Sequence, residues 1–208
     1  LIPALKKAGI EMVFNAKYPP DIKDMTSMLL EIKNLNPDAV LAYAYPGDAI
    51  LYMNQAREVG INAKNQFVMV GPAIGFFRGM FQQNLDGIIT MGSWSPNMKG
   101  TLGAEEFYMA YKKKFEGHEP DYLDSAEVFV SCQILEQAIA KVGLDREKIR
   151  QAIQTNTFGT IYGDVKFDGV QNATIPTGFL QVQNGGIEII WPKNRATAPI
   201  IDKGAWTK

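Results

Sequence analysis

Three short loops carry residues suited to holding a small organic molecule without covalent chemistry. Their most prominent side chains are Tyr18, Tyr45 and Phe76, and each tyrosine precedes a proline. An aromatic ring offers a stacking face, a tyrosine hydroxyl also donates and accepts hydrogen bonds, and proline stiffens a turn. Each loop follows an apolar run, and ligands of open parallel sheets bind at the carboxyl ends of strands. The pattern indicates a binding site, although a surface-loop role explains Tyr18 more simply, and core packing explains Phe76 equally well.

The chain lacks the short motifs of common catalytic sites. It contains no Gly-x-x-x-x-Gly-Lys phosphate loop, no Gly-x-Gly-x-x-Gly, no His-Glu-x-x-His and no Gly-x-Ser-x-Gly. The single histidine, His118, has no second histidine to form a relay or a ligand pair, so we expect it to be exposed in a loop. The single cysteine, Cys132, lies in an apolar helical stretch and is predicted to be a buried, inert thiol. We therefore expect no enzyme, no metal site and no cofactor.

The overall charge gives no reason to expect a nucleic-acid or membrane-surface partner. Twenty-one basic and 22 acidic residues leave a formal net charge of −1, and 46% of the 208 residues are hydrophobic. This is an ordinary globular composition. The chain opens inside a helix-like segment, so we expect sequence upstream of it to be missing.

The elements that position the three loops alternate between helix and strand over the first ninety-odd residues. Strands are predicted at 11–17, 36–45, 66–71 and 86–94, and helices at 24–35 and 48–59. Two of these strands contain continuous apolar runs, as expected of parallel strands buried on both faces. Asp48 is predicted to cap the helix that it begins.

The pattern changes after Pro96. Two successive helices are predicted at 105–115 and 126–143, and Asp145 is predicted to be the N-cap of a third helix that runs through Gln154. Strand patterns return at 162–169 and 179–192, where Asn184 and Gly185 between two apolar runs predict a hairpin.

The order of these segments resembles the second lobe of type I periplasmic solute-binding proteins of the Leu/Ile/Val-binding family. The resemblance covers nearly all of the chain and includes AGIEMVF, NPDAVLAYAYPGDAI, VGPAIGFF, DGIITMGSWSP and YGDVKFDG. It implies an α/β fold, with a parallel sheet flanked by helices, in which residues 1–94 form the core of lobe two. Residues 95–177 would add helices and a strand to lobe one, whose core is absent, and residues 178–208 would return to lobe two.

The same resemblance implies a function and a set of site residues. Such proteins capture a solute outside the cytoplasm, in the periplasm of many bacteria, and deliver it to an ABC permease in the membrane. Members that bind amino acids carry an acidic residue where this chain has Ala73, so the expected solute is a carboxylate with an aromatic or aliphatic body. An amino-acid-like compound stays open as the alternative if another acidic residue substitutes. The expected ligand-binding residues lie in or near the cleft loops: Tyr18, Tyr45, Pro72, Ala73, Phe76 and Trp94. A ligand-sensing receptor or amide-type regulator with the same fold is the alternative function.

Overall fold

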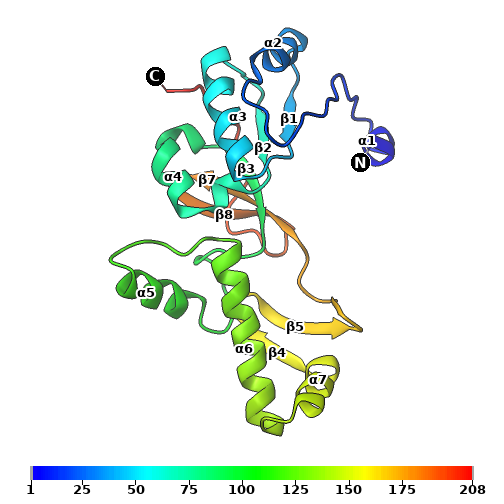
Figure 1. Ribbon diagram of the computed structural model, residues 1–208, viewed down its shortest axis with the longest axis vertical. Helices are drawn as coiled ribbons and strands as arrows, with labels where there is room; N and C mark the ends of the chain where they lie inside the picture. Colours follow the sequence, from blue (N-terminus) through cyan, green and yellow to red (C-terminus); the bar gives the residue numbers. More distant parts are fainter. Residues whose placement is uncertain (1, 208) are drawn as a thin grey trace.

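The computed structural model describes residues 2–207. Within them, two sheets lie at opposite ends of an elongated molecule (Figure 1). The larger sheet has the strand order β1-β2-β3-β7-β8 and the smaller one the order β4-β5-β6. The strands of the larger sheet are β1 (Ala39–Ala42), β2 (Asn65–Val68), β3 (Ile88–Gly92), β7 (Gly178–Gln183) and β8 (Gly186–Trp191). Those of the smaller sheet are β4 (Thr157–Thr160), β5 (Gly163–Asp168) and β6 (Gln171–Asn172).

Seven α-helices and two short 3-10 helices, η1 and η2, accompany these strands in the described chain. They are α1 (Ile2–Lys7), α2 (Thr26–Leu35), α3 (Pro46–Val59), η1 (Gly71–Ala73), α4 (Gly75–Phe81), η2 (Gln82–Leu85), α5 (Ala104–Lys114), α6 (Asp124–Val142) and α7 (Arg146–Thr155). Helices α2, α3 and α4 accompany the larger sheet, whereas α5, α6 and α7 lie with the smaller sheet (Figure 1). None of the helices between residues 2 and 207 is both long and apolar enough to cross a bilayer.

The larger sheet begins as the parallel ladder that the sequence predicts. β1 pairs in parallel with β2, and β2 with β3, whereas β7 and β8 are antiparallel additions. Side chains of one face, including Val40, Val68 and Leu180, are buried in the main core. On the other face Leu41 and Phe179 are 46% and 42% exposed. The described residues therefore cover the two faces of this sheet unequally.

Two predicted local features of the C-terminal part are confirmed. Asp145 is the N-cap of α7, and its carboxylate accepts hydrogen bonds from two backbone N–H groups of the first turn. Asn184 and Gly185 have φ angles of 52° and 77°, which a tight hairpin turn between β7 and β8 requires. The chain passes twice between the two sheets, once after β3 and once before β7 (Figure 1).

Three sequence predictions are wrong in detail. Residues 11–17 form no strand, because they pair with neither of the two sheets. Asp48 does not cap α3, which begins earlier at Pro46 with Tyr45 as N-cap and no side-chain cap bond. Cys132 is exposed rather than buried, because it lies on the side of α6 that the described residues leave open. His118 is exposed, as predicted.

Candidate functional site

The three predicted loops meet at the carboxyl edge of the parallel strands. β1 ends at Ala42 and β2 at Val68, and these two residues are partners in the parallel register. The loop that carries Tyr45 therefore lies beside the loop that leads to Ala73. The Tyr18 hydroxyl donates a long hydrogen bond, 3.5 Å, to the Tyr43 carbonyl, so the first loop reaches the same edge.

Tyr45 is the most accessible aromatic side chain of this edge. Its backbone is extended, with φ −80° and ψ 169°, as expected of a residue that precedes a proline. Pro46 then starts α3 at a position where no backbone N–H is needed. The Tyr45 side chain is 70% exposed, so its ring and hydroxyl are free to contact a solute.

Asp48 lies in the first turn of α3, where a carboxylate interacts favourably with the helix dipole. Burial raises the pKa of the Tyr18 hydroxyl, and the negative charge of Asp48 raises it further. The structure thus gives this edge an acidic group for which the sequence suggested only a capping role.

The third loop is tightly folded. The Phe77 ring covers Gly71 so closely that a Cβ at this glycine would lie 2.5 Å from a ring carbon. Pro72 and Ala73 are buried, and Ala73 has no exposed surface. Phe76, in contrast, is 56% exposed at the start of α4. Of the residues predicted in this loop, Phe76 is therefore the one that an incoming molecule can touch directly.

Trp94 does not lie at the carboxyl edge of the parallel strands. It has no exposed surface, and its ring packs against those of Phe107 and Tyr122 at centroid distances of 5.4 and 5.3 Å. These aromatic residues form the core where the chain passes from β3 toward the smaller sheet. Trp94 thus packs between α5 and the α5–α6 connection. Its burial does not agree with the expected contact between Trp94 and a solute.

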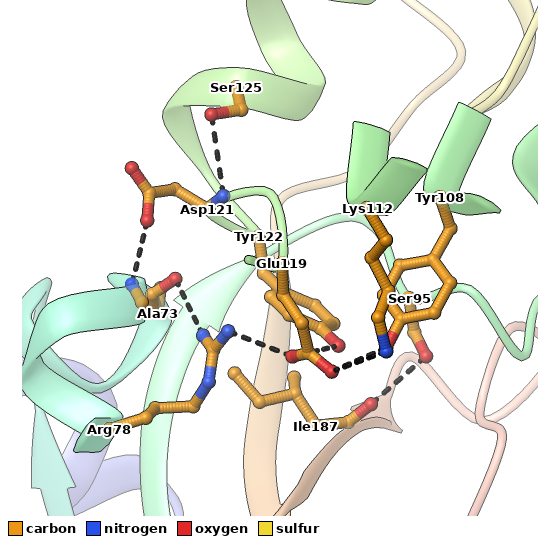
Figure 2. A network of polar contacts seen from close by, with 11 residues as sticks. Ala73, Arg78, Ser95, Tyr108, Lys112, Glu119, Asp121, Tyr122, Ser125 and Ile187 are labelled. Carbon is orange, nitrogen blue, oxygen red and sulfur yellow. Dashed lines mark hydrogen bonds and ion pairs between the residues drawn. The ribbon is translucent and has the colours of Figure 1, made fainter. Parts of the chain in front are cut away.

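A polar network next to the third loop was not predicted from the sequence (Figure 2). Arg78 of α4 forms an ion pair with Glu119, with 3.0 Å between Nη2 and Oε2. Glu119 also accepts hydrogen bonds from the hydroxyls of Tyr108 and Tyr122. Burial, followed by the hydrogen bond and charge of Glu119, raises the pKa of Tyr108 to about 12. A lone arginine in the apolar stretch GFFRGMF is the signal that could have drawn attention to this network.

No group of three or more potential His, Cys, Asp or Glu metal ligands occurs between residues 2 and 207. At the carboxyl edge of the parallel strands, the exposed aromatic side chains of Tyr45 and Phe76 accompany the carboxylate of Asp48 and a buried loop backbone. Such an arrangement can stack and hydrogen-bond a small molecule.

Comparison with known proteins identifies the family. A family model described as periplasmic binding protein matches residues 2–186. The chain belongs to the type I periplasmic binding protein family. It is 30% identical to Leu/Ile/Val-binding protein homolog 7 of Brucella melitensis, over 94% of this chain and 51% of that protein. The resemblance inferred from the segment order is confirmed, and the chain spans about half the length of the curated relatives it matches.

Solved structures of this family share the fold. A solute-binding protein of an ABC transporter from R. palustris, in complex with benzoate, has a TM-score of 0.73 at 18% identity and matches 96% of this chain and 54% of its own. A branched-chain amino acid transporter substrate-binding protein from Streptococcus pneumoniae, in complex with isoleucine, has a TM-score of 0.74 at 19% identity and matches 97% and 56%. The predicted parallel sheet flanked by helices is confirmed as part of a type I periplasmic binding protein fold.

Proposed function

We propose that this chain is part of the extracytoplasmic solute-binding component of an ABC importer. Its larger sheet would form one wall of a cleft that closes on a small organic molecule. The observation that carries the proposal is the parallel register of β1 and β2, which brings the Tyr45 and Ala73 loops to one edge. The exposed rings of Tyr45 and Phe76 at this edge supply contact surface.

A first lobe, outside this chain, would form the opposite wall. Apolar side chains of α5 and α6 support this part of the proposal, because Met109, Val128 and Leu135 are 59%, 65% and 46% exposed. Between these helices lies an open apolar groove of about 420 Å³, lined by residues that include Phe107 and Phe129. Apolar patches of this kind mark surfaces that another part of a protein covers. The length of the curated relatives leaves room for such a lobe.

We further propose that the solute is a carboxylate with an aromatic or aliphatic body. Position 73 carries no carboxylate that could pair with an ammonium, and a buried charge without a partner is strongly disfavoured. Ala73 itself is buried, so the argument concerns the missing acid and not a direct contact of this side chain. Tyr45 and Phe76 suit an apolar or aromatic body. The benzoate and isoleucine in the two structural neighbours belong to those proteins, and both are carboxylates.

An amino acid is the competing solute. Asp48 favours it, because this carboxylate lies near enough to Tyr18 to raise the pKa of that hydroxyl and could pair with an ammonium in place of an acid at position 73. The exchange Asp48→Asn separates the two possibilities. It would abolish amino-acid binding that depends on this charge, whereas it would leave the binding of a simple carboxylate intact or improve it.

The proposed mechanism requires only that the solute binds the closed arrangement of the two lobes more tightly than the open one. A solute that contacts both lobes stabilises the closed arrangement relative to the open one, and the closed form is then recognised by the permease. The two chain passages between the sheets of this structure are the connections at which bending between the two parts would occur (Figure 1).

A thermal-shift panel tests the proposal. The complete binding protein is heated with benzoates, phenylpropenoates, leucine, isoleucine and valine, each in large excess. A ligand at 100 times its Kd stabilises the folded state by about 2.7 kcal/mol, which is easily measured. We expect a shift from carboxylates that lack an amine. Stabilisation by leucine or valine alone would contradict the solute class, and a protein stabilised by no small molecule would contradict the function.

A further inference from the structure

We propose that Arg78, Glu119 and Asp121 are positioning residues that hold the loop from Gly71 to Gly75 in its binding shape. This inference rests on the proposed function, because the loop is part of the proposed cleft edge. The three residues are here called the loop clasp. Arg78 belongs to α4, whereas Glu119 and Asp121 belong to the connection between α5 and α6 (Figure 2).

The clasp binds the loop through its backbone. The Ala73 carbonyl accepts hydrogen bonds from the Tyr122 backbone N–H, at 3.0 Å, and from Arg78 Nη1, at 3.1 Å. The backbone N–H of Gly75 donates to Asp121 Oδ1 at 2.7 Å. The loop is thus tied on both sides of Ile74 to a segment more than forty residues further along the chain.

Asp121 supplies a cap that the local sequence lacks. Gly75 is the first residue of α4, and Ile74, at the N-cap position, has no polar side chain to accept from the free N–H groups. Helix η1 likewise has no side-chain cap bond. Both elements are too short to be stable alone, with three and seven residues. Their conformation therefore depends on the carboxylate that reaches them from outside.

The Arg78–Glu119 ion pair fixes the Arg78 guanidinium relative to the segment that carries Asp121. The Arg78 side chain is only 11% exposed, and its guanidinium lies 4.6 Å from the centroid of the Tyr122 ring. Glu119 is held by the hydroxyls of Tyr108 and Tyr122 and lies 4.0 Å from Lys112 Nζ. With this many partners, the Glu119 carboxylate is held in one position. Removing its charge would release the guanidinium that donates to the Ala73 carbonyl.

The clasp has a direct consequence for the cleft edge. Phe76, which is exposed, follows Gly75 immediately, so the direction of its ring depends on how α4 begins. Loosening the bond between Gly75 and Asp121 would let this ring and the loop backbone sample other positions. A solute would then have to order them on binding, which weakens its affinity.

The test compares three variants of the complete binding protein with the solute that gives the largest shift in the thermal panel. Asp121→Ala removes the acceptor for Gly75, whereas Asp121→Asn keeps an oxygen that can accept the same bond. Glu147→Gln is the matched control, because it neutralises a carboxylate whose ion pair with Arg150 on α7 is exposed. The dissociation constant is measured by calorimetry, and amide hydrogen exchange is followed for residues 71–77 and for β7 and β8.

We expect Asp121→Ala to raise the Kd about tenfold, the change that corresponds to the loss of one charge-assisted hydrogen bond. Exchange should accelerate in residues 71–77 and not in β7 or β8. Asp121→Asn should recover most of the affinity, and Glu147→Gln should match the wild type. The inference is overturned if Asp121→Ala binds like the wild type, or if its exchange rises throughout the chain. A wild type that binds no solute refutes the proposed function itself, which is a different result.

Discussion

Gly178 is the position at which adding one methyl group should damage the larger sheet most clearly. It is the first residue of β7 and pairs with Gly92 of β3. A Cβ at this position would lie 2.7 Å from the Trp191 carbonyl oxygen and 2.8 Å from that of Gly92. Both are backbone atoms of neighbouring strands, so no side-chain rotation relieves the contact. Overpacking typically costs 1–3 kcal/mol, and we expect Gly178→Ala to lie at the upper end, about 3 kcal/mol.

Urea unfolding followed by circular dichroism measures this loss as a lower midpoint at an unchanged slope. Gly186→Ala is the control in the same hairpin, because its Cβ would meet only the Gln183 carbonyl oxygen, at an ordinary 3.6 Å. The control should be neutral or gain up to about 1 kcal/mol through the unfolded state. A Gly178→Ala variant as stable as this control would show that the strands do not approach each other here as described.

Three further predictions concern single polar groups. Tyr52→Phe should lower stability by about 1–2 kcal/mol in urea unfolding, because the buried Tyr52 hydroxyl donates to Gln66 Oε1 at 3.2 Å; an unchanged midpoint would contradict it. Asp145→Ala should cost about 1 kcal/mol, seen as a lower thermal midpoint, because it removes the N-cap of α7. The Tyr108 pKa is raised to about 12, so its neutral form stabilises the fold below pH 10, and this contribution is lost between about pH 10 and 12. In urea unfolding at pH values over that window, the free energy of unfolding should therefore decrease less steeply with pH in Tyr108→Phe than in the wild type.

Local sequence signals predicted the elements that depend on local chemistry. The Asp145 cap and the turn at Asn184 and Gly185 are each fixed by a few adjacent residues, and both were found where expected. Residues 11–17 have the apolar pattern of a strand but make no ladder bonds. A strand requires a neighbouring strand to pair with, and whether one is present depends on the tertiary structure, which the periodicity of a single segment does not reveal.

The candidate site was predictable only in part. The exposure of Tyr45 and Phe76 agrees with loops that follow strands, whereas the burial of Trp94 depends on α5 packing over it. The bonds of Arg78 and Asp121 join positions 41 and 46 residues apart in the chain. Nothing in the local pattern of either residue indicates its partner, so the clasp emerges only from the folded chain.

The central claim is that the edge shared by β1 and β2 is a wall of a solute cleft, and Tyr45 tests it most directly. The solute found in the thermal panel is titrated by calorimetry into the wild type, Tyr45→Ala and Leu144→Ala, the last a residue 85% exposed between α6 and α7. We predict that losing the Tyr45 ring raises the Kd about tenfold or more, while Leu144→Ala binds as the wild type does. Equal affinity in all three proteins would contradict the account.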